Sequence, residues 1–178
     1  MKQRQNNWYV ITGAPCSGKT TLLQKLEAKN FHISYEAARI YIDEEMKKGR
    51  TLKDIRKNEV SFQKTVLKLK IELEKNLNKE EIIFFERGIH DSSAYYKLCG
   101  VKEDSLLKDA IKNSFYKKVF VLDILSYKKD YARVEDIEQA KKLDLSLEKS
   151  YQEAGMNVIR VPVLSLQKRI DFILDRIV

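Results

Sequence analysis

The sequence predicts an α/β fold in which helices cover both faces of a parallel five-stranded sheet. Five apolar strand candidates alternate with segments of helical spacing along the 178 residues, and such alternation is typical of parallel strands joined by crossover helices. Two of the candidates, residues 82–85 and 119–122, are continuous apolar runs, as in strands that are buried on both faces. The length suits one sizeable core, so we expect a single domain over residues 1–178.

The strands and helices follow from where apolar residues recur along the chain. The expected strands span residues 8–12, 31–35, 81–86, 118–124 and 157–163. The expected helices span residues 19–29, 36–48, 52–78, 91–98, 103–114, 135–154 and 165–177. In the third helix, apolar residues at helical spacing form a stripe of Phe62, Val66, Leu69, Leu73 and Leu77. This stripe predicts a face that packs against the core.

The segment after the first strand matches the phosphate-binding loop pattern without a mismatch, with Gly13 followed by Gly18-Lys19-Thr20 at the required spacing. Glycines let backbone N–H groups approach an anion closely, and the start of the next helix adds further donors and a favourable dipole. We therefore expect this loop to bind a nucleoside triphosphate. The residues expected to contact it are Gly13, Ala14, Pro15, Cys16, Ser17, Gly18, Lys19, Thr20 and Thr21.

Lys19 and Thr20 have separate expected roles in the loop. Lys19 can reach the β- and γ-phosphates as a catalytic cation, and the Thr20 hydroxyl can hold Mg²⁺. We expect ATP as the nucleotide. GTP stays open: the chain lacks the Asn-Lys-x-Asp motif of GTPases, but contacts to the base of ATP are often made by the backbone and leave no motif.

Charged residues directly follow the second strand, where Glu36 and Arg39 occur. The carboxyl ends of parallel strands are where ligands bind, and charges there are costly unless they have partners. Glu36 could accept the proton of an acceptor hydroxyl, orient a water molecule or hold Mg²⁺. The alternative is a carboxylate that only stabilises the start of a helix through the helix dipole.

Glu86, Arg87 and Asp91 follow the third strand. A carboxylate at Glu86 can hold Mg²⁺ through water, because Mg²⁺ usually keeps several of its waters. Arg87 can pair with a phosphate or orient an acceptor hydroxyl. The alternative is a structural ion pair at the end of a strand.

A further charged group follows the fourth strand, from Tyr127 through Lys128, Lys129 and Asp130 to Arg133. An arginine at this place can close over the phosphates and neutralise charge in the transition state, so Arg133 is a candidate catalytic residue. The alternative is a solvated surface charge, which we prefer for the two lysines.

Composition limits the classes of partner. The net charge is +8, but the lysines are mixed with glutamates and no run of five basic residues occurs, which favours a solvated surface over a nucleic-acid site. No apolar run approaches the ~20 residues of a membrane span, and the polar start lacks a signal-peptide pattern. Two isolated cysteines, Cys16 and Cys99, indicate reduced thiols, so we expect a cytoplasmic protein. His32 and His90 lack partners at metal-ligand spacing.

Several of these segments together resemble the NadR-like P-loop ATPase/kinase family, which includes the nicotinamide riboside kinase-type domain. Deoxyribonucleoside kinases are a more distant match. The resemblance covers almost the whole chain. The segments that carry it are residues 13–20, Tyr35-Glu36-Ala37-Ala38-Arg39, Phe62-Gln63, residues 85–95, residues 127–133 and Val161-Pro162-Val163.

The resemblance implies a three-layer P-loop kinase with strand order 2-3-1-4-5. It also implies that Glu36 is the catalytic base, that Gln63 contacts the edge of a base, and that Arg87 and Asp91 lie near the acceptor. We expect Arg39 to bind the acceptor as well. The chain departs from the deoxyribonucleoside kinase pattern at Gly88, where serine is usual, and in having one lid arginine instead of several.

The sequence thus favours a Mg²⁺-dependent small-molecule kinase that transfers the γ-phosphate of ATP to a nucleoside-like or nucleotide-like acceptor. The alternative is a regulatory NTPase with slow hydrolysis and no small-molecule acceptor. A nucleic-acid end kinase is favoured by the charge alone, whereas Glu36 and Gln63 favour a compact acceptor pocket. The acceptor and the oligomeric state stay open.

Overall fold

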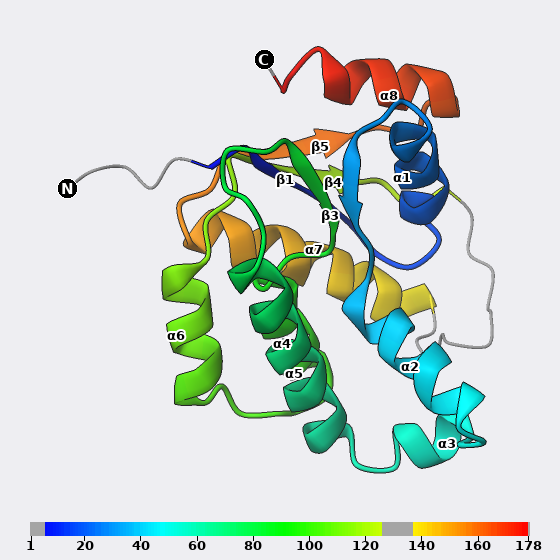
Figure 1. Cartoon of the computed structure of the whole chain (residues 1–178), viewed down its shortest axis with the longest axis vertical. Helices are drawn as coiled ribbons and strands as arrows, with labels where there is room; N and C mark the ends of the chain where they lie inside the picture. Colours follow the sequence, from blue (N-terminus) through cyan, green and yellow to red (C-terminus); the bar gives the residue numbers. More distant parts are fainter. Residues whose placement is uncertain (1–5, 126–136, 178) are drawn as a thin grey trace.

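The computed structural model describes residues 6–125 and 137–177, and its centre is a five-stranded parallel sheet (Figure 1). The strand order is β2-β3-β1-β4-β5, which confirms the order implied by the family resemblance. All neighbouring strands pair in parallel. The strands are β1 (Trp8–Thr12), β2 (His32–Ser34), β3 (Ile83–Glu86), β4 (Lys118–Leu122) and β5 (Val158–Val161).

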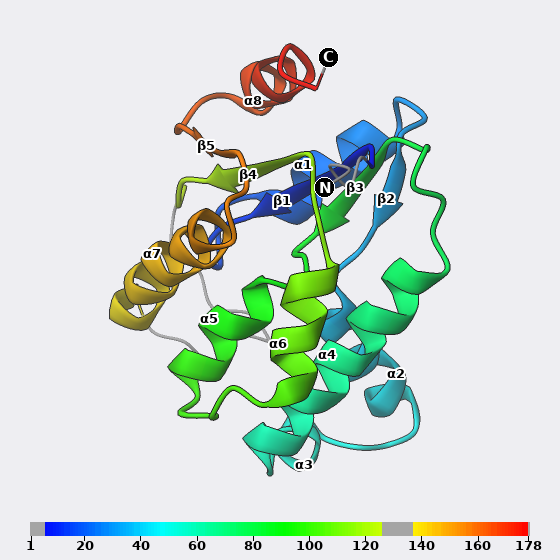
Figure 2. The same cartoon turned by 90° about the vertical axis from the view of Figure 1, so that its left-hand side faces the viewer.

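Helices cover both faces of this sheet and complete three layers. Helices α1 and α8 lie on one face, and α7 lies on the other together with α4, α5 and α6 (Figures 1 and 2). No helix within residues 6–125 and 137–177 is both long and apolar enough to cross a bilayer. The helices are α1 (Lys19–Glu27), α2 (Ala37–Lys47), α3 (Leu52–Ile55), α4 (Glu59–Lys75), α5 (Asp91–Leu98), α6 (Ser105–Asn113), α7 (Ile137–Glu153) and α8 (Leu166–Leu174).

The central strand β1 divides the core in two, because successive side chains of a strand point to opposite faces. Tyr9 and Ile11 pack with residues of α1 and α8. Trp8 and Val10 pack on the opposite face, where Tyr151 of α7 contributes to the cluster. Burial on both faces explains why these strands are continuous apolar runs in the sequence.

The strand register brings the ends of three strands to one edge of the sheet. Ile11 of β1 pairs with Glu86 of β3, and Ser34 of β2 pairs with Phe85. The phosphate loop after β1, the start of α2 after β2 and the segment after β3 therefore meet at this edge. This is the position predicted for the ligand site.

One predicted helix, residues 52–78, is wrong in its extent, because the chain forms two helices there. Thr51 and Asp54 form a capping box at the start of α3. The chain then breaks at Asn58, whose side chain accepts a hydrogen bond from Ser61 N at 2.9 Å and caps α4. Asparagine at such a position favours a new helix start over continuation of the old one.

The predicted apolar stripe of this segment is also wrong in part. Phe62 and Val66 are buried, but Leu69 and Leu73 are 37% and 43% exposed. The side chains that α4 buries are Phe62, Gln63, Val66, Leu67 and Lys70. The helix packs against α2 and α5. Its buried face includes the polar residues Gln63 and Lys70, which a prediction from apolar spacing does not detect.

Candidate active site

The loop between β1 and α1 has the backbone shape of an anion-binding loop. Gly13 has a φ of +134°, and a Cβ atom there would lie 2.5 Å from the carbonyl oxygen of Leu122. Gly18 has a φ of +82°, and Cys16 adopts a φ of +64°. Both glycines are therefore required by the backbone, and the loop runs directly into the N-terminus of α1.

Lys19 lies inside this loop with its ammonium group buried. Its Nζ donates hydrogen bonds to Gly13 O at 3.1 Å, Ala14 O at 2.9 Å and Ser17 Oγ at 3.2 Å. Burial and, to a smaller extent, the nearby Arg87 lower the pKa of Lys19 to about 7. A phosphate beside this ammonium would favour its charged form.

Two side chains that the sequence analysis did not single out hold the loop in place. Arg169 of α8 is 2% exposed and donates to Ser17 O at 2.6 Å, Pro162 O at 3.1 Å and Asp123 O at 2.8 Å. Asp144 of α7 accepts a hydrogen bond from Ala14 N at 3.1 Å. Their partners in the loop are backbone groups, which carry no signal in the sequence.

The Thr20 hydroxyl donates a hydrogen bond of 2.6 Å to Glu86 Oε1. Burial raises the pKa of Glu86, and the charge of Glu36 raises it further. A cation bound here would offset both the burial of the Glu86 carboxylate and its repulsion by Glu36. A hydroxyl and a carboxylate together suit Mg²⁺ when phosphates and waters supply its remaining ligands. Among the described residues no group of three or more His, Cys, Asp or Glu side chains forms a metal site by itself.

Arg87 lies between two carboxylates. Its Nε donates to Glu36 Oε1 at 3.1 Å, and its Nη1 donates to Asp91 Oδ1 at 3.3 Å. Its guanidinium also lies 5.2 Å from the centre of the Tyr95 ring. Burial opposes ionisation of Glu36, but Arg87, Lys19 and Arg39 outweigh it, so the pKa of Glu36 falls. The pair is therefore charged at neutral pH.

Asp91 is fully buried and does not line the pocket described below. Besides Arg87, it accepts hydrogen bonds from Thr12 Oγ1 at 2.5 Å, Gly88 N at 2.9 Å and the Tyr151 hydroxyl. These contacts place Asp91 behind Arg87, where it orients the guanidinium. We predicted that Asp91 lies near the acceptor, and no observation tests this directly. Its position behind Arg87 does not favour direct contact with an acceptor.

The packing around Gly88 explains why this chain has glycine where deoxyribonucleoside kinases usually have serine. A Cβ atom there would lie 2.6 Å from the ring of Tyr116. The Tyr116 hydroxyl accepts a hydrogen bond from Ile89 N at 2.8 Å and donates to Glu74. The tyrosine thus occupies the space that a serine side chain at position 88 would need.

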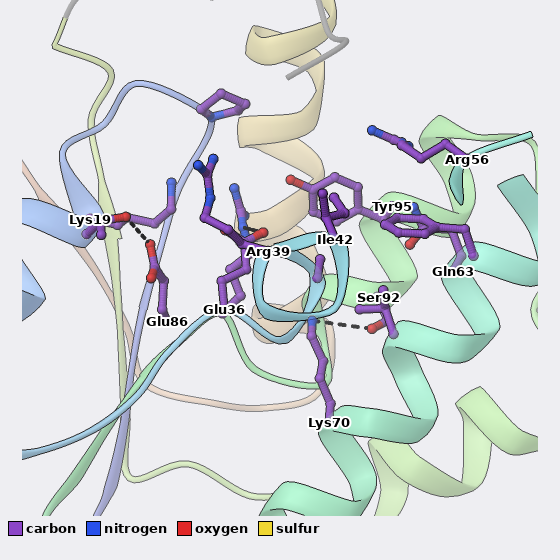
Figure 3. Close-up of a pocket in the computed structure, with 16 residues that line it drawn as sticks. Lys19, Glu36, Arg39, Ile42, Arg56, Gln63, Lys70, Glu86, Ser92 and Tyr95 are labelled. Carbon is purple, nitrogen blue, oxygen red and sulfur yellow. Dashed lines mark hydrogen bonds and ion pairs between the residues drawn. The ribbon is translucent and has the colours of Figure 1, made fainter. Parts of the chain in front are cut away.

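A pocket opens beside the phosphate loop and runs between α2, α4 and α5 (Figure 3). Eight predicted site residues line it: Pro15, Lys19, Thr20, Glu36, Arg39, Gln63, Glu86 and Arg87. Four further polar or aromatic side chains line it that were not predicted: Arg56, Lys70, Ser92 and Tyr95. Arg133 and the charged residues 127–130 lie outside the described residues.

Lys70 is the least expected of these side chains. It is 6% exposed, and its Nζ donates to Gly88 O at 2.9 Å and contacts Ser92 Oγ at 3.5 Å. Burial lowers the pKa of Lys70. One signal for it was present in the sequence, because Lys70 follows Gln63 by seven residues and so lies on the same face of α4.

His90 does not line the pocket. Its ring stacks on Tyr151 at a centroid distance of 5.1 Å and meets Tyr116 edge-on at 5.7 Å. Within the described part of the chain, neither ring nitrogen has a hydrogen-bond partner. Burial lowers the pKa of His90 to about 4. A substrate contact through His90 is thus not favoured. His32 lies 2.9 Å from Glu81 Oε1 and is far from the site in the fold.

Comparison with known proteins agrees with this geometry. A family model described as an AAA domain matches residues 8–169. No curated protein matches the sequence. The fold is similar to several solved P-loop kinases.

Three of these structures illustrate the similarity. A thymidylate kinase from Ehrlichia chaffeensis is 14% identical with a TM-score of 0.65, over 96% of this chain and 97% of that chain. The NadR protein in complex with NR is 16% identical with a TM-score of 0.69, over 96% of this chain and 49% of that chain. A deoxyadenosine kinase from M. mycoides with bound dATP is 18% identical with a TM-score of 0.65, over 95% and 98% of the two chains. At these identities the likeness shows the fold.

Proposed function

The chain belongs to the family of AAA domains whose model matches it, and we propose that it is a Mg²⁺-dependent small-molecule kinase. It transfers the γ-phosphate of ATP to a hydroxyl of a nucleoside-like or nucleotide-like acceptor. The observation that carries the proposal is one pocket lined both by Lys19 of the phosphate loop and by the Glu36–Arg87 pair. A site for the triphosphate thus adjoins a carboxylate that can receive a proton.

The proposed roles follow from what phosphoryl transfer requires, namely positioning of the reactants and neutralisation of charge. Lys19 binds the β- and γ-phosphates. Glu36 is ionised at neutral pH because its pKa is lowered, so it can accept the proton of an acceptor hydroxyl held in line with the γ-phosphate. Arg87 orients Glu36 and offers charge to the transferring group.

Thr20 and Glu86 are proposed to hold Mg²⁺, on the evidence of their 2.6 Å contact. Bound there, Mg²⁺ neutralises charge on the phosphate oxygens. Gln63, whose Nε2 donates to Glu59 Oε1 at 2.8 Å, is proposed to contact the acceptor together with Arg39. Arg133 remains the candidate for a cation that closes over the phosphates.

A phosphoryl-transfer screen tests the proposal. The protein is mixed with ATP or GTP, Mg²⁺ and individual nucleosides, nucleotides or ribosides, and ADP or GDP formation is measured. We expect at least one acceptor to stimulate product formation well above the rate without acceptor. A screen without stimulation by any acceptor would favour a regulatory NTPase with slow basal hydrolysis.

Glu36→Gln is the matched variant for this screen. It keeps the shape and hydrogen bonding of the side chain but removes the base, so acceptor-dependent ADP formation should fall by about 100-fold or more while ATP still binds. Glu44→Gln is the control, since Glu44 is an exposed residue of the same helix, α2. Equal activity of the two variants would exclude Glu36 as the base.

A further inference from the structure

Lys70 places a buried positive charge in the pocket without a carboxylate in contact. An ammonium group has three N–H donors, and Lys70 uses them on Gly88 O and, at a long distance, on Ser92 Oγ. Within residues 6–125 and 137–177, no Asp or Glu oxygen lies within ion-pair distance of its Nζ. Asp91, Glu36 and Glu74 act on it only through space. Burying an ammonium in this way is costly.

The side chains around Lys70 make the acceptor end of the pocket positive. Among the described residues that line it, five carry a positive charge and two a negative charge. Lys19 belongs to the phosphate loop, and Arg87 is paired with Glu36. In Figure 3, Lys70 and Ser92 lie on the far side of Glu36 and Arg39 from Lys19 and Glu86. The Lys70 charge is therefore located away from the triphosphate.

The remaining wall of the pocket is suited to a ring. Ile42, Phe62 and Val66 line it, and Arg56 lies 5.0 Å from the centre of the Phe62 ring. Arg56 also pairs with Glu59 at 2.7 Å, whereas Lys70 lines the same pocket without a carboxylate of the described residues in contact. An uncharged acceptor would leave this charge uncompensated, whereas an anion would compensate it.

We propose that the acceptor is anionic: besides the hydroxyl that is phosphorylated, it carries a carboxylate or phosphate group that binds the Lys70 ammonium and the Ser92 hydroxyl. The proposal takes the acceptor pocket from the proposed kinase function and adds the charge of its substrate. Lys70 is then a specificity-determining residue. A charge-assisted hydrogen bond in a buried site is the strong kind of polar contact, so it separates charged from uncharged acceptors.

Matched pairs of acceptors test this proposal by calorimetry, with a non-hydrolysable ATP analogue and Mg²⁺ bound. The pairs for a carboxylate are orotidine with uridine, and nicotinic acid riboside with nicotinamide riboside. The pair for a phosphate is cytidine 3′-monophosphate with cytidine. In at least one pair we expect the anionic member to bind about tenfold more tightly or better, since hydrogen bonds to charged groups contribute that much.

Variants assign the preference to Lys70. Lys70→Gln should remove the preference for the anionic member, and Lys70→Arg should retain most of it because the charge is kept. Lys68→Gln is the control, since Lys68 is exposed on the same helix. The comparison of acceptors on the unaltered protein needs no variant, so it decides the proposal even if Lys70→Gln does not fold.

The outcomes separate this proposal from the kinase assignment. If the unaltered protein binds no anionic member more tightly than its neutral partner, the anion site is overturned, whether or not phosphate is transferred. If the protein prefers an anionic acceptor and Lys70→Gln leaves that preference unchanged, Lys70 is not the residue that causes it. If an anionic member binds tightly through Lys70 but no acceptor is phosphorylated, the anion site stands and the kinase proposal fails.

Discussion

Glu36 and Glu86 show how one site gives two carboxylates opposite tendencies. Both are near Lys19 and Arg87, yet the pKa of Glu36 is lowered and that of Glu86 is raised. Glu36 contacts the Arg87 guanidinium at 3.1 Å, whereas Glu86 contacts a neutral hydroxyl, and burial together with the charge of Glu36 raises its pKa. Two carboxylates whose surroundings shift their pKa values in opposite directions commonly have different roles in a site. Glu36 suits a base, and Glu86 suits a carboxylate that needs a cation.

The role of Glu86 gives a prediction at the residue scale. Glu86→Gln should weaken ATP binding in the presence of Mg²⁺ by about tenfold or more, the loss that is typical when a group supporting a metal is removed. Binding without Mg²⁺ should not weaken, because no metal contact is lost and the variant removes a negative charge that repels phosphates. Calorimetric titration of ATP with Mg²⁺ and with a chelator measures both values. An equal loss under the two conditions would instead indicate a structural role.

At the scale of elements, two tyrosines hold the segment that carries Arg87. Tyr116, just before β4, accepts from Ile89 N, and Tyr151 of α7 accepts from Gly88 N at 3.1 Å. Arg87 itself has a φ of +65°, a conformation that is costly for a residue other than glycine. The hydrogen bonds to the tyrosines help to maintain this backbone shape, which aims the guanidinium at Glu36.

Gly88→Ala tests this packing. The added Cβ atom would lie 2.6 Å from the Tyr116 ring, so the variant should lower the free energy of unfolding by about 1–3 kcal/mol, as overpacking of a core does. Denaturation with urea measures the loss. The same change in a Tyr116→Leu background should cost less because the ring is absent. An identical cost in both backgrounds would show that the clash with Tyr116 is not the cause.

The strands and the charged residues that directly follow them could be predicted from the sequence, because both are recognised from neighbouring residues in the chain. The apolar run before Gly13 and the residues Glu36, Glu86 and Arg87 stand directly at the ends of strands, so their meeting at one edge follows from a parallel sheet. The break at Asn58 was missed because the apolar spacing continues across it. The anchors Arg169 and Asp144 were missed because they bind the backbone of the loop, and such contacts depend on the tertiary fold.

At the scale of the whole molecule, the polar groups behind the sheet form a buried network that links α4, α5 and α7. Glu74 of α4 accepts hydrogen bonds from Tyr116 and from Ser114 Oγ at 2.7 Å. Tyr151 of α7 donates to Asp91 at the start of α5. His90 packs against both tyrosine rings, which also contact each other. Such networks make the fold sensitive to protonation, because each buried group favours one charge state.

His90 gives a prediction about acid stability. Burial, opposed by Asp91 and aided by Lys70, lowers the pKa of His90 from an ordinary 6.5 to about 4. Below pH 6.5 the unfolded chain therefore binds more protons than the folded one. The contribution of His90 to stability is complete above about pH 6.5 and is lost as the pH falls to about 4, by up to about 3 kcal/mol.

A comparison with His90→Phe isolates this effect. Glu74 acts in the opposite direction, because burial raises its pKa to about 6, so its protonation favours the folded state as the pH falls below that value. The Glu74 contribution is expected to be present in both proteins and to cancel in the difference between them. Phenylalanine keeps an aromatic ring against Tyr116 and Tyr151 but does not titrate. The free energy of unfolding is measured by urea denaturation at several pH values. Between pH 7 and pH 4.5 the unaltered protein should lose more stability than His90→Phe does. Parallel curves for the two proteins would mean that His90 does not titrate as a buried base.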